Sequence, residues 1–183
     1  IETFLPVNTF DEVLEHLKGK CKMNLDRSIG IIEPVMKMVR RHGMEDQILM
    51  KSDPSEQSLK LIEAYAPDID YMPIFMEEDH ASEKIEKMKI HYAGAELVFK
   101  TEQSPIVQEA YLEEQKKKGR VLWGNAILYS SRVPLAGGHS DDISLLEDPD
   151  QGWGWLAQKG FDIIQTDWAM HCVNYLRENN YRK

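Results

Sequence analysis

Apolar residues along this chain follow two alternating patterns: short consecutive runs, and longer stretches in which they recur every three or four residues. The first long stretch, residues 9–17, carries its apolar side chains at helical spacing. Thr9 opens this stretch and Glu12 follows three residues later, which is the pattern of a capping box. We therefore predict a helix that begins after Thr9.

The two patterns alternate to the end of the chain. Asp53, Pro54 and Glu56 predict a second capped helix, with Asp53 as N-cap and Pro54 as the first helical residue. The predicted strands are residues 22–26, 47–50, 71–76, 95–99, 121–128 and 161–164. The predicted helices are residues 9–17, 31–42, 54–65, 81–92, 106–118, 153–158 and 169–179. About six βα units with short links indicate a parallel α/β sheet covered by helices.

One connection, from Tyr129 to Asp150, is much longer than the others. It carries Gly137-Gly138-His139-Ser140-Asp141-Asp142 and shows no clear periodicity of its own. A connection of this length in a compact domain is often functional, although a mobile surface loop explains it equally well. The glycine pair is no phosphate cradle by itself, because the lysine and the spacing of a P-loop are missing.

Composition narrows the class of protein. A chain of 183 residues fits one domain, residues 1–183, and is shorter than the roughly 250 residues of a typical (β/α)8 barrel. The net charge of −9 argues against a general nucleic-acid binder. No stretch of 18 uninterrupted apolar residues predicts a membrane span. We expect a soluble protein, and the compartment stays open, with periplasm and secretion among the choices.

The residues that could take part in binding or catalysis stand where predicted strands end. Carboxylates at such positions can hold a hard cation such as Mg²⁺ or Ca²⁺, lysines can neutralise a phosphate oxygen, and a tryptophan can wall a pocket. For each of them, helix capping or a surface ion pair is the alternative, and Asp167 in particular could cap the last helix. The candidates are Asp26, Lys51, Ser52, Lys100, Glu102, Trp123, Asn125 and Asp167.

Four segments together carry a resemblance to a known family. Residues 7–14, 23–26, 122–125 and 160–167 are similar, in order and at plausible spacing, to successive landmarks of the glycerophosphodiester phosphodiesterase family. The match extends from about Val7 to Tyr181, and it is the order of the four motifs that makes it specific. The resemblance implies a TIM barrel that uses Mg²⁺ or Ca²⁺ to cleave glycerophosphodiesters.

The resemblance also implies roles for individual residues. Asp26 stands where the family has a metal-binding Glu, with the same charge and a shorter side chain, while the family's Lys two residues later is Ser28 here. Trp123 and Asn125 match a substrate-pocket motif, and Lys51 joins them as a candidate for substrate binding. Asp167 matches the final motif, and we interpret it as a structural or rim residue.

The family's remaining catalytic residues have no counterpart in this sequence. A His-Arg-Gly, a Glu-x-Asp and a His-Asp precede the third strand in the family, and the match begins after them. The resemblance therefore predicts a TIM barrel that lacks its first two strands in this chain. The chain can be the C-terminal portion of a longer enzyme, it can be completed by another chain through swapping or homo-oligomerisation, or it can be a remodelled relative. We favour the first explanation.

The leading functional hypothesis is metal-dependent hydrolysis of glycerophosphodiesters, a phosphodiesterase activity of lipid metabolism that residues 1–183 do not complete alone. The competing hypothesis is a non-catalytic binding or interaction domain on a degenerate barrel. Catalytic residues are unknown under either hypothesis, because the family's histidines have no match here.

Overall fold

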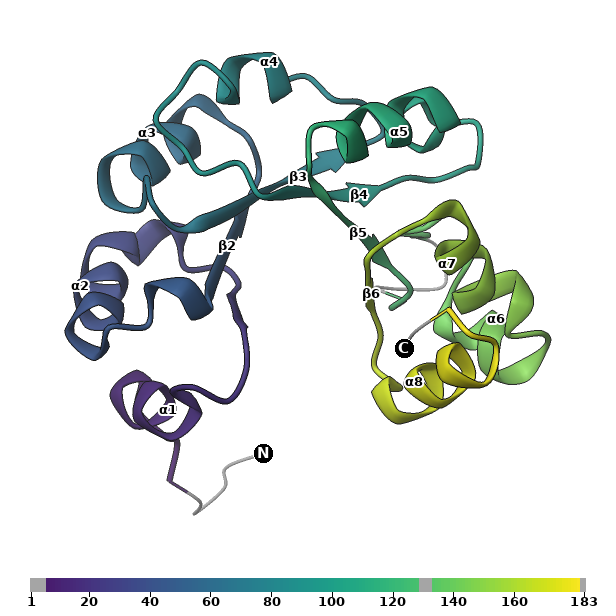
Figure 1. The fold of residues 1–183 in the computed structure, drawn as a ribbon, viewed down its shortest axis with the longest axis horizontal. Helices are drawn as coiled ribbons and strands as arrows, with labels where there is room; N and C mark the ends of the chain where they lie inside the picture. Colours follow the sequence, from purple (N-terminus) through teal and green to yellow (C-terminus); the bar gives the residue numbers. More distant parts are fainter. Residues whose placement is uncertain (1–5, 129–132, 182–183) are drawn as a thin grey trace.

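The protein folds as a curved sheet of six parallel strands with helices along its outer side (Figure 1). This computed structural model describes residues 6–128 and 133–181. The strands pair in chain order, so each βα unit lies beside its predecessor. The strands are β1 Met23–Leu25, β2 Ile48–Ser52, β3 Asp70–Met76, β4 Gly94–Val98, β5 Val121–Asn125 and β6 Ile163–Gln165. This confirms the expected parallel α/β sheet, and its curl makes it part of a barrel.

Helices follow the strands and line the convex side of the arc, with α1 near one end and α8 near the other (Figure 1). The α-helices are α1 Phe10–Leu17, α2 Ile32–His42, α3 Glu56–Tyr65, α4 Ser82–Ile85, α5 Glu109–Lys117, α6 Asp141–Leu146, α7 Trp155–Lys159 and α8 Ala169–Glu178. The 3-10 helices are η1 Ile29–Ile31, η2 Glu45–Gln47 and η3 Pro105–Val107, and η4 Asp150–Gly154 is a π-helix. In the described residues, no helix has both the length and the apolar character needed to span a membrane.

The two faces of the sheet differ in character because successive strand residues point to opposite sides. Tyr71, Phe75 and Leu97 are buried in one apolar core that the sheet shares with the helices. Residues at alternate positions, among them Lys51 and Glu96, line a cavity on the concave side. The helices thus cover the apolar face, and polar groups are left for the barrel interior.

Two predicted helix starts have different outcomes. The capping box of α1 is confirmed, since Thr9 accepts from the Glu12 backbone and Glu12 accepts from the Thr9 backbone. The prediction for α3 is wrong by two residues: Ser55 is the N-cap, and its side chain accepts from the backbone N–H of Ser58. Asp53 instead accepts from the Ser58 hydroxyl at 2.8 Å, so it supports the helix start from outside.

Two predicted elements are too long. The helix expected over residues 81–92 is the single turn α4, because the following segment returns beside β3, where the Tyr71 backbone N–H donates to His91 and the Ala93 N–H donates to Tyr71. Strand β5 ends at Asn125 rather than at residue 128.

The long connection is shorter and more ordered than its sequence suggested. Residues 129–132, where it begins, lie outside the described residues. Further on, Phe99 and Ala136 form a parallel bridge, α6 lies within the connection, and η4 begins at its last residue, Asp150. Helix α6 has only six residues, too few to show helical periodicity against its flanks.

Candidate functional site

A buried polar cluster lies on the concave face of the sheet, built by three different strands. The ammonium of Lys51 on β2 donates to Glu96 Oε2 on β4 at 2.7 Å. The amide of Asn125, the last residue of β5, donates to Glu96 Oε1 at 3.0 Å. The exposed fractions of Lys51, Glu96 and Asn125 are 5%, 4% and 6%, so the carboxylate bridges two partners in a largely buried position.

Trp123 and Gln165 hold this cluster from one side. The Lys51 ammonium lies 3.8 Å from the centre of the Trp123 ring, which is a cation–π distance. The indole N–H of Trp123 donates to Gln165 Oε1 at 3.1 Å, and this bond fixes the orientation of the ring. Since β5 and β6 pair through Trp123 and Ile163, the tryptophan is anchored by the sheet as well as by its side chain.

One atom of the cluster has no partner. Among the buried side-chain nitrogen and oxygen atoms of the described residues, Asn125 Oδ1 alone makes no hydrogen bond. Leaving a buried acceptor unpaired costs about 1–3 kcal/mol, so such atoms are rare and call for an explanation. Exchanging the amide oxygen and nitrogen of Asn125 by rotation would not pair the oxygen. It would place the oxygen against the Glu96 carboxylate, which needs a donor there.

The cluster forms part of the lining of a cavity of about 420 Å³ at the carboxyl ends of the strands. We call this cavity the rim pocket. Lys51, Glu96 and Asn125 line it together with apolar residues such as Ile74 and Val98, and the loop after β1 contributes Asp26 and Arg27. A pocket with a few converging polar groups and apolar walls, on this face of a curled parallel sheet, is a typical ligand site.

Asp26 lies at this pocket but outside the buried cluster. Its side chain is 60% exposed, and its ion pair with Arg27 is long, at 3.9 Å. Arg27 adopts a left-handed backbone conformation, φ 53°, directly after Asp26, which is uncommon for a residue with a side chain. The described residues contain no group of three or more His, Cys, Asp or Glu that could hold a metal ion. They do not form a metal centre, and Asp26 offers one exposed carboxylate.

The structure brings some of the predicted site residues together and separates others. Lys51, Ser52, Asn125 and Asp26 all line the rim pocket. The Ser52 hydroxyl lies 3.0 Å from the buried Tyr71 hydroxyl, whose pKa burial raises to about 12, so this contact ties the pocket lining to the core.

Two further candidates lie in the β4–α5 loop. The backbone N–H of Lys100 donates to Glu77 at 2.9 Å. Glu102 contacts His139 Nε2 at 3.0 Å, and the His139 ring stacks on Trp155 with 3.7 Å between centroids. These contacts attach residues 133–140 to the body of the protein, and neither Lys100 nor Glu102 lines the rim pocket.

Asp167 is exposed, and it does not cap the last helix. The N-cap position of α8 is Trp168, whose backbone N–H donates to the Thr166 hydroxyl. The buried carboxylate of this region is Asp141, which accepts from Trp153 Nε1 at 2.7 Å, Thr166 Oγ1 at 2.6 Å and the Asp167 backbone N–H at 2.9 Å. Asp141 thereby connects α6, η4 and the end of β6.

Glu96 is the functional candidate that the sequence analysis missed. It stands inside the apolar run Ala95–Phe99, which we assigned as an ordinary strand. A single charged residue in the middle of a buried strand was the available signal, because charges are almost never fully buried without a partner.

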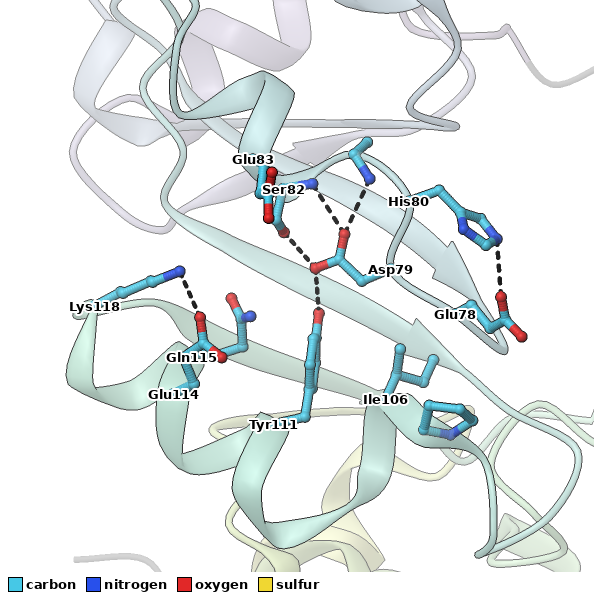
Figure 2. Close-up of a pocket in the computed structure, with 12 residues that line it drawn as sticks. Glu78, Asp79, His80, Ser82, Glu83, Ile106, Tyr111, Glu114, Gln115 and Lys118 are labelled. Carbon is cyan, nitrogen blue, oxygen red and sulfur yellow. Dashed lines mark hydrogen bonds and ion pairs between the residues drawn. The ribbon is translucent and has the colours of Figure 1, made fainter.

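A second cavity, of about 570 Å³, lies on the outer side between α4 and α5 and is lined by several acidic residues (Figure 2). Asp79 is at its centre and accepts from the Ala81 and Ser82 backbone N–H groups at 3.1 and 2.9 Å, from the Ser82 hydroxyl, and from the Tyr111 hydroxyl at 2.9 Å. Burial, together with the neighbouring Asp79 carboxylate, raises the pKa of Tyr111. The contacts of Asp79 with Ala81 and Ser82 fix the start of α4, and its contact with Tyr111 joins that start to α5, so the carboxylate has a structural role.

The fold and the rim pocket define the class of the protein: an α/β partial barrel with a polar pocket at the strand ends. The chain belongs to a family described as a domain of unknown function (DUF4996), whose model matches residues 71–176, more than half of the 183 residues. No curated protein matches the chain.

Two solved structures share the fold. A protein from Galdieria sulphuraria, described as a glycerophosphodiester phosphodiesterase, is 14% identical with a TM-score of 0.62, covering 91% of this chain and 63% of its own. A glycerophosphoryl diester phosphodiesterase from Parabacteroides distasonis is 15% identical with a TM-score of 0.72, covering 93% of this chain and 55% of its own. The chain therefore spans between half and two thirds of the length of these structures, which confirms the expected partial barrel.

Proposed function

We propose that this chain supplies the substrate-binding part of a barrel that hydrolyses glycerophosphodiesters. The observation that carries the proposal is the buried Lys51–Glu96–Asn125 cluster beneath a pocket at the carboxyl ends of the strands. Enzymes built on barrels of this kind bind their substrates at that face. The likeness of fold to two proteins named for this activity supports the same reaction class.

Lys51, Trp123 and Asn125 are the substrate-binding residues in this proposal. They are preorganised, because each is held by a neighbouring side chain: Lys51 and Asn125 by Glu96, and Trp123 by Gln165. Preorganised polar groups in a pocket with apolar walls orient a ligand at a lower entropic cost of binding, because few side chains need to be ordered.

We assign Asp26 as one ligand of a divalent cation, Mg²⁺ or Ca²⁺. Its carboxylate is exposed at the rim pocket, and hard cations prefer carboxylate oxygens. Since the described residues form no metal centre, the other ligands in this proposal come from residues outside them. The sheet edges also call for further residues in this proposal, because within the described part of the chain β1 pairs only with β2 and β6 only with β5. A segment preceding residue 1 in a longer chain would pair both edges.

The second candidate is a non-catalytic binding domain on the same scaffold. The observation that favours it is the missing metal centre among the described residues. In that case the rim pocket still binds a ligand, but no cation-dependent turnover follows from it.

Hydrolysis of glycerophosphocholine separates the two candidates. The assay measures glycerol 3-phosphate release by the complete gene product that contains residues 1–183, and by residues 1–183 alone, with Mg²⁺, Ca²⁺ or EDTA. We expect cation-dependent turnover by the complete protein and none by residues 1–183 alone. Asp26→Ala and Lys51→Met should lower turnover at least tenfold, while the exposed control Lys60→Met on α3 should leave it unchanged.

Each result has a clear meaning. A complete protein that shows no turnover with either cation contradicts the enzymatic proposal and supports the binding domain. If residues 1–183 alone hydrolyse the diester and Asp26→Ala abolishes this turnover, the proposal that further metal ligands are needed is contradicted.

A further inference from the structure

The floor of the rim pocket, which we define as Lys51, Glu96 and Asn125, carries no net charge although it contains a lysine. Lys51 and Glu96 are both buried, and their charged atoms are 2.7 Å apart. An anion placed at the floor would be attracted by the ammonium and repelled by the carboxylate beside it. The carboxylate offsets part of the attraction, while the cost of removing the anion from water remains.

The hydrogen-bonding capacity of the floor suits a neutral group. Both oxygens of Glu96 are used by Lys51 and Asn125. What remains is the unpartnered Oδ1 of Asn125 and the capacity of the Lys51 ammonium that neither Glu96 nor the Trp123 ring takes. One free acceptor beside free donors matches a hydroxyl group, which both donates and accepts, better than the phosphate group of a diester, which only accepts.

A purely structural role explains this arrangement poorly. A buried ion pair gives little net stability compared with apolar residues of similar size, and this one leaves an acceptor unpaired. The surrounding inner face is apolar at Ile74 and Val98, so apolar side chains would fit these positions.

We infer that Glu96 is a specificity-determining residue, which neutralises Lys51 so that the pocket floor accepts an uncharged hydroxyl-bearing group and rejects phosphate. The inference rests on the proposed function and adds the orientation of the substrate to it. The uncharged end of a diester substrate lies at the floor, and its phosphate lies toward the mouth, where the Arg27 side chain is 84% exposed.

The test compares two probes, glycerol and inorganic phosphate, on the intact protein. The indole N–H resonance of Trp123, assigned with Trp123→Phe, reports on the floor because this ring contacts Lys51. We expect glycerol to shift the resonance saturably, with phosphate binding at least tenfold more weakly. In Glu96→Gln the lysine charge is no longer compensated, so phosphate should bind at least tenfold more tightly than in the unmodified protein, reversing the preference.

The control removes one negative charge elsewhere. Glu114→Gln, on α5 in the outer cavity, also changes the net charge by one, and should leave both titrations unchanged. Lys51→Gln/Glu96→Gln restores a neutral floor and should regain the preference for glycerol. Melting temperatures identify any variant that fails to fold, and the comparison of probes on the unmodified protein does not depend on the variants.

Three results overturn the inference: phosphate binding at the floor as tightly as glycerol in the unmodified protein, no response of Trp123 to either probe, or a folded Glu96→Gln protein with an unchanged preference. Because binding is read without turnover, this failure differs from failure of the proposed function. A protein that hydrolyses the diester yet binds phosphate at the floor contradicts only the present inference.

Discussion

The two polar clusters of this half-barrel, one inside the sheet around Glu96 and one outside it around Asp79, use their hydrogen bonds differently. Asp79 accepts four hydrogen bonds, all from the segment after β3 and from α5. Glu96 also uses both oxygens, but its partners keep unused capacity: Asn125 Oδ1 is unpaired. The outer cluster is complete, and the inner one is not.

This difference separates a structural role from a ligand-binding one. A complete cluster gains nothing from a ligand, because every donor already has its acceptor. An incomplete cluster that is rigidly held carries a cost of desolvation, which a ligand can relieve. The cavity around Asp79 is the larger of the two, so size alone would have selected the wrong pocket.

The largest effect is expected when the inner ion pair is broken on one side. Glu96→Ala leaves the Lys51 ammonium buried without its counterion, and we expect a loss of about 3–5 kcal/mol in the free energy of unfolding. Lys51→Met/Glu96→Leu removes both charges and should recover most of that loss. Urea denaturation followed by far-UV circular dichroism measures both variants. A double variant as unstable as Glu96→Ala would show that the pair itself holds the barrel together.

The next effect concerns the outer cluster. Asp79→Ala removes the acceptor for the backbone N–H groups of Ala81 and Ser82 and leaves the half-buried Tyr111 hydroxyl without this partner. We expect a loss of about 2–3 kcal/mol, as the sum of a lost cap and an unpaired hydroxyl.

The response of the Trp123 resonance to glycerol should not change in Asp79→Ala, because the outer cluster does not reach the rim pocket. Tyr111→Phe is the matched control, and it should cost about 1 kcal/mol because no donor is left unpaired. Weaker glycerol binding in a folded Asp79→Ala protein would show that the two clusters are coupled.

A smaller effect separates binding from stability within the inner cluster. Asn125→Leu has two opposite effects on stability: loss of the unpaired acceptor stabilises the protein, and loss of the donor to Glu96 destabilises it. The free energy of unfolding should therefore change by about 1 kcal/mol or less. Glycerol binding should fall at least tenfold in the same Trp123 titration. A loss of stability above about 2 kcal/mol would mean that Asn125 has a structural role like that of Asp79.

Sequence patterns predicted the parallel sheet because parallel strands are continuous apolar runs and their helices carry local capping signals, and the family resemblance added the barrel. Lys51 and Asn125 were found because they stand at or near strand ends, and Trp123 because it matches the pocket motif of that family. Glu96 was not found, since its importance depends on partners from β2 and β5 that are 45 and 29 residues away. The single turn of α4 was overestimated because tertiary pairing of residues 91–93 with Tyr71 overrides the local helical pattern.

The smallest effect is expected from the exposed ion pairs of the helical layer, in contrast to the buried pair inside. Arg40 on α2 donates to Asp68 at 2.5 and 2.8 Å, and these hydrogen bonds hold the pKa of Asp68 below its usual value. A carboxylate with a lowered pKa in the folded state stabilises the protein above its unfolded pKa of about 4, and this contribution is lost as the pH falls through the folded value.

Both side chains of the Arg40–Asp68 pair are more than a third exposed, so the contribution should stay below about 1 kcal/mol. Urea midpoints between pH 6 and pH 2.5 measure it, with Asp68→Asn as control: the variant should show a flatter acid limb, and identical acid limbs would show that this pair contributes nothing.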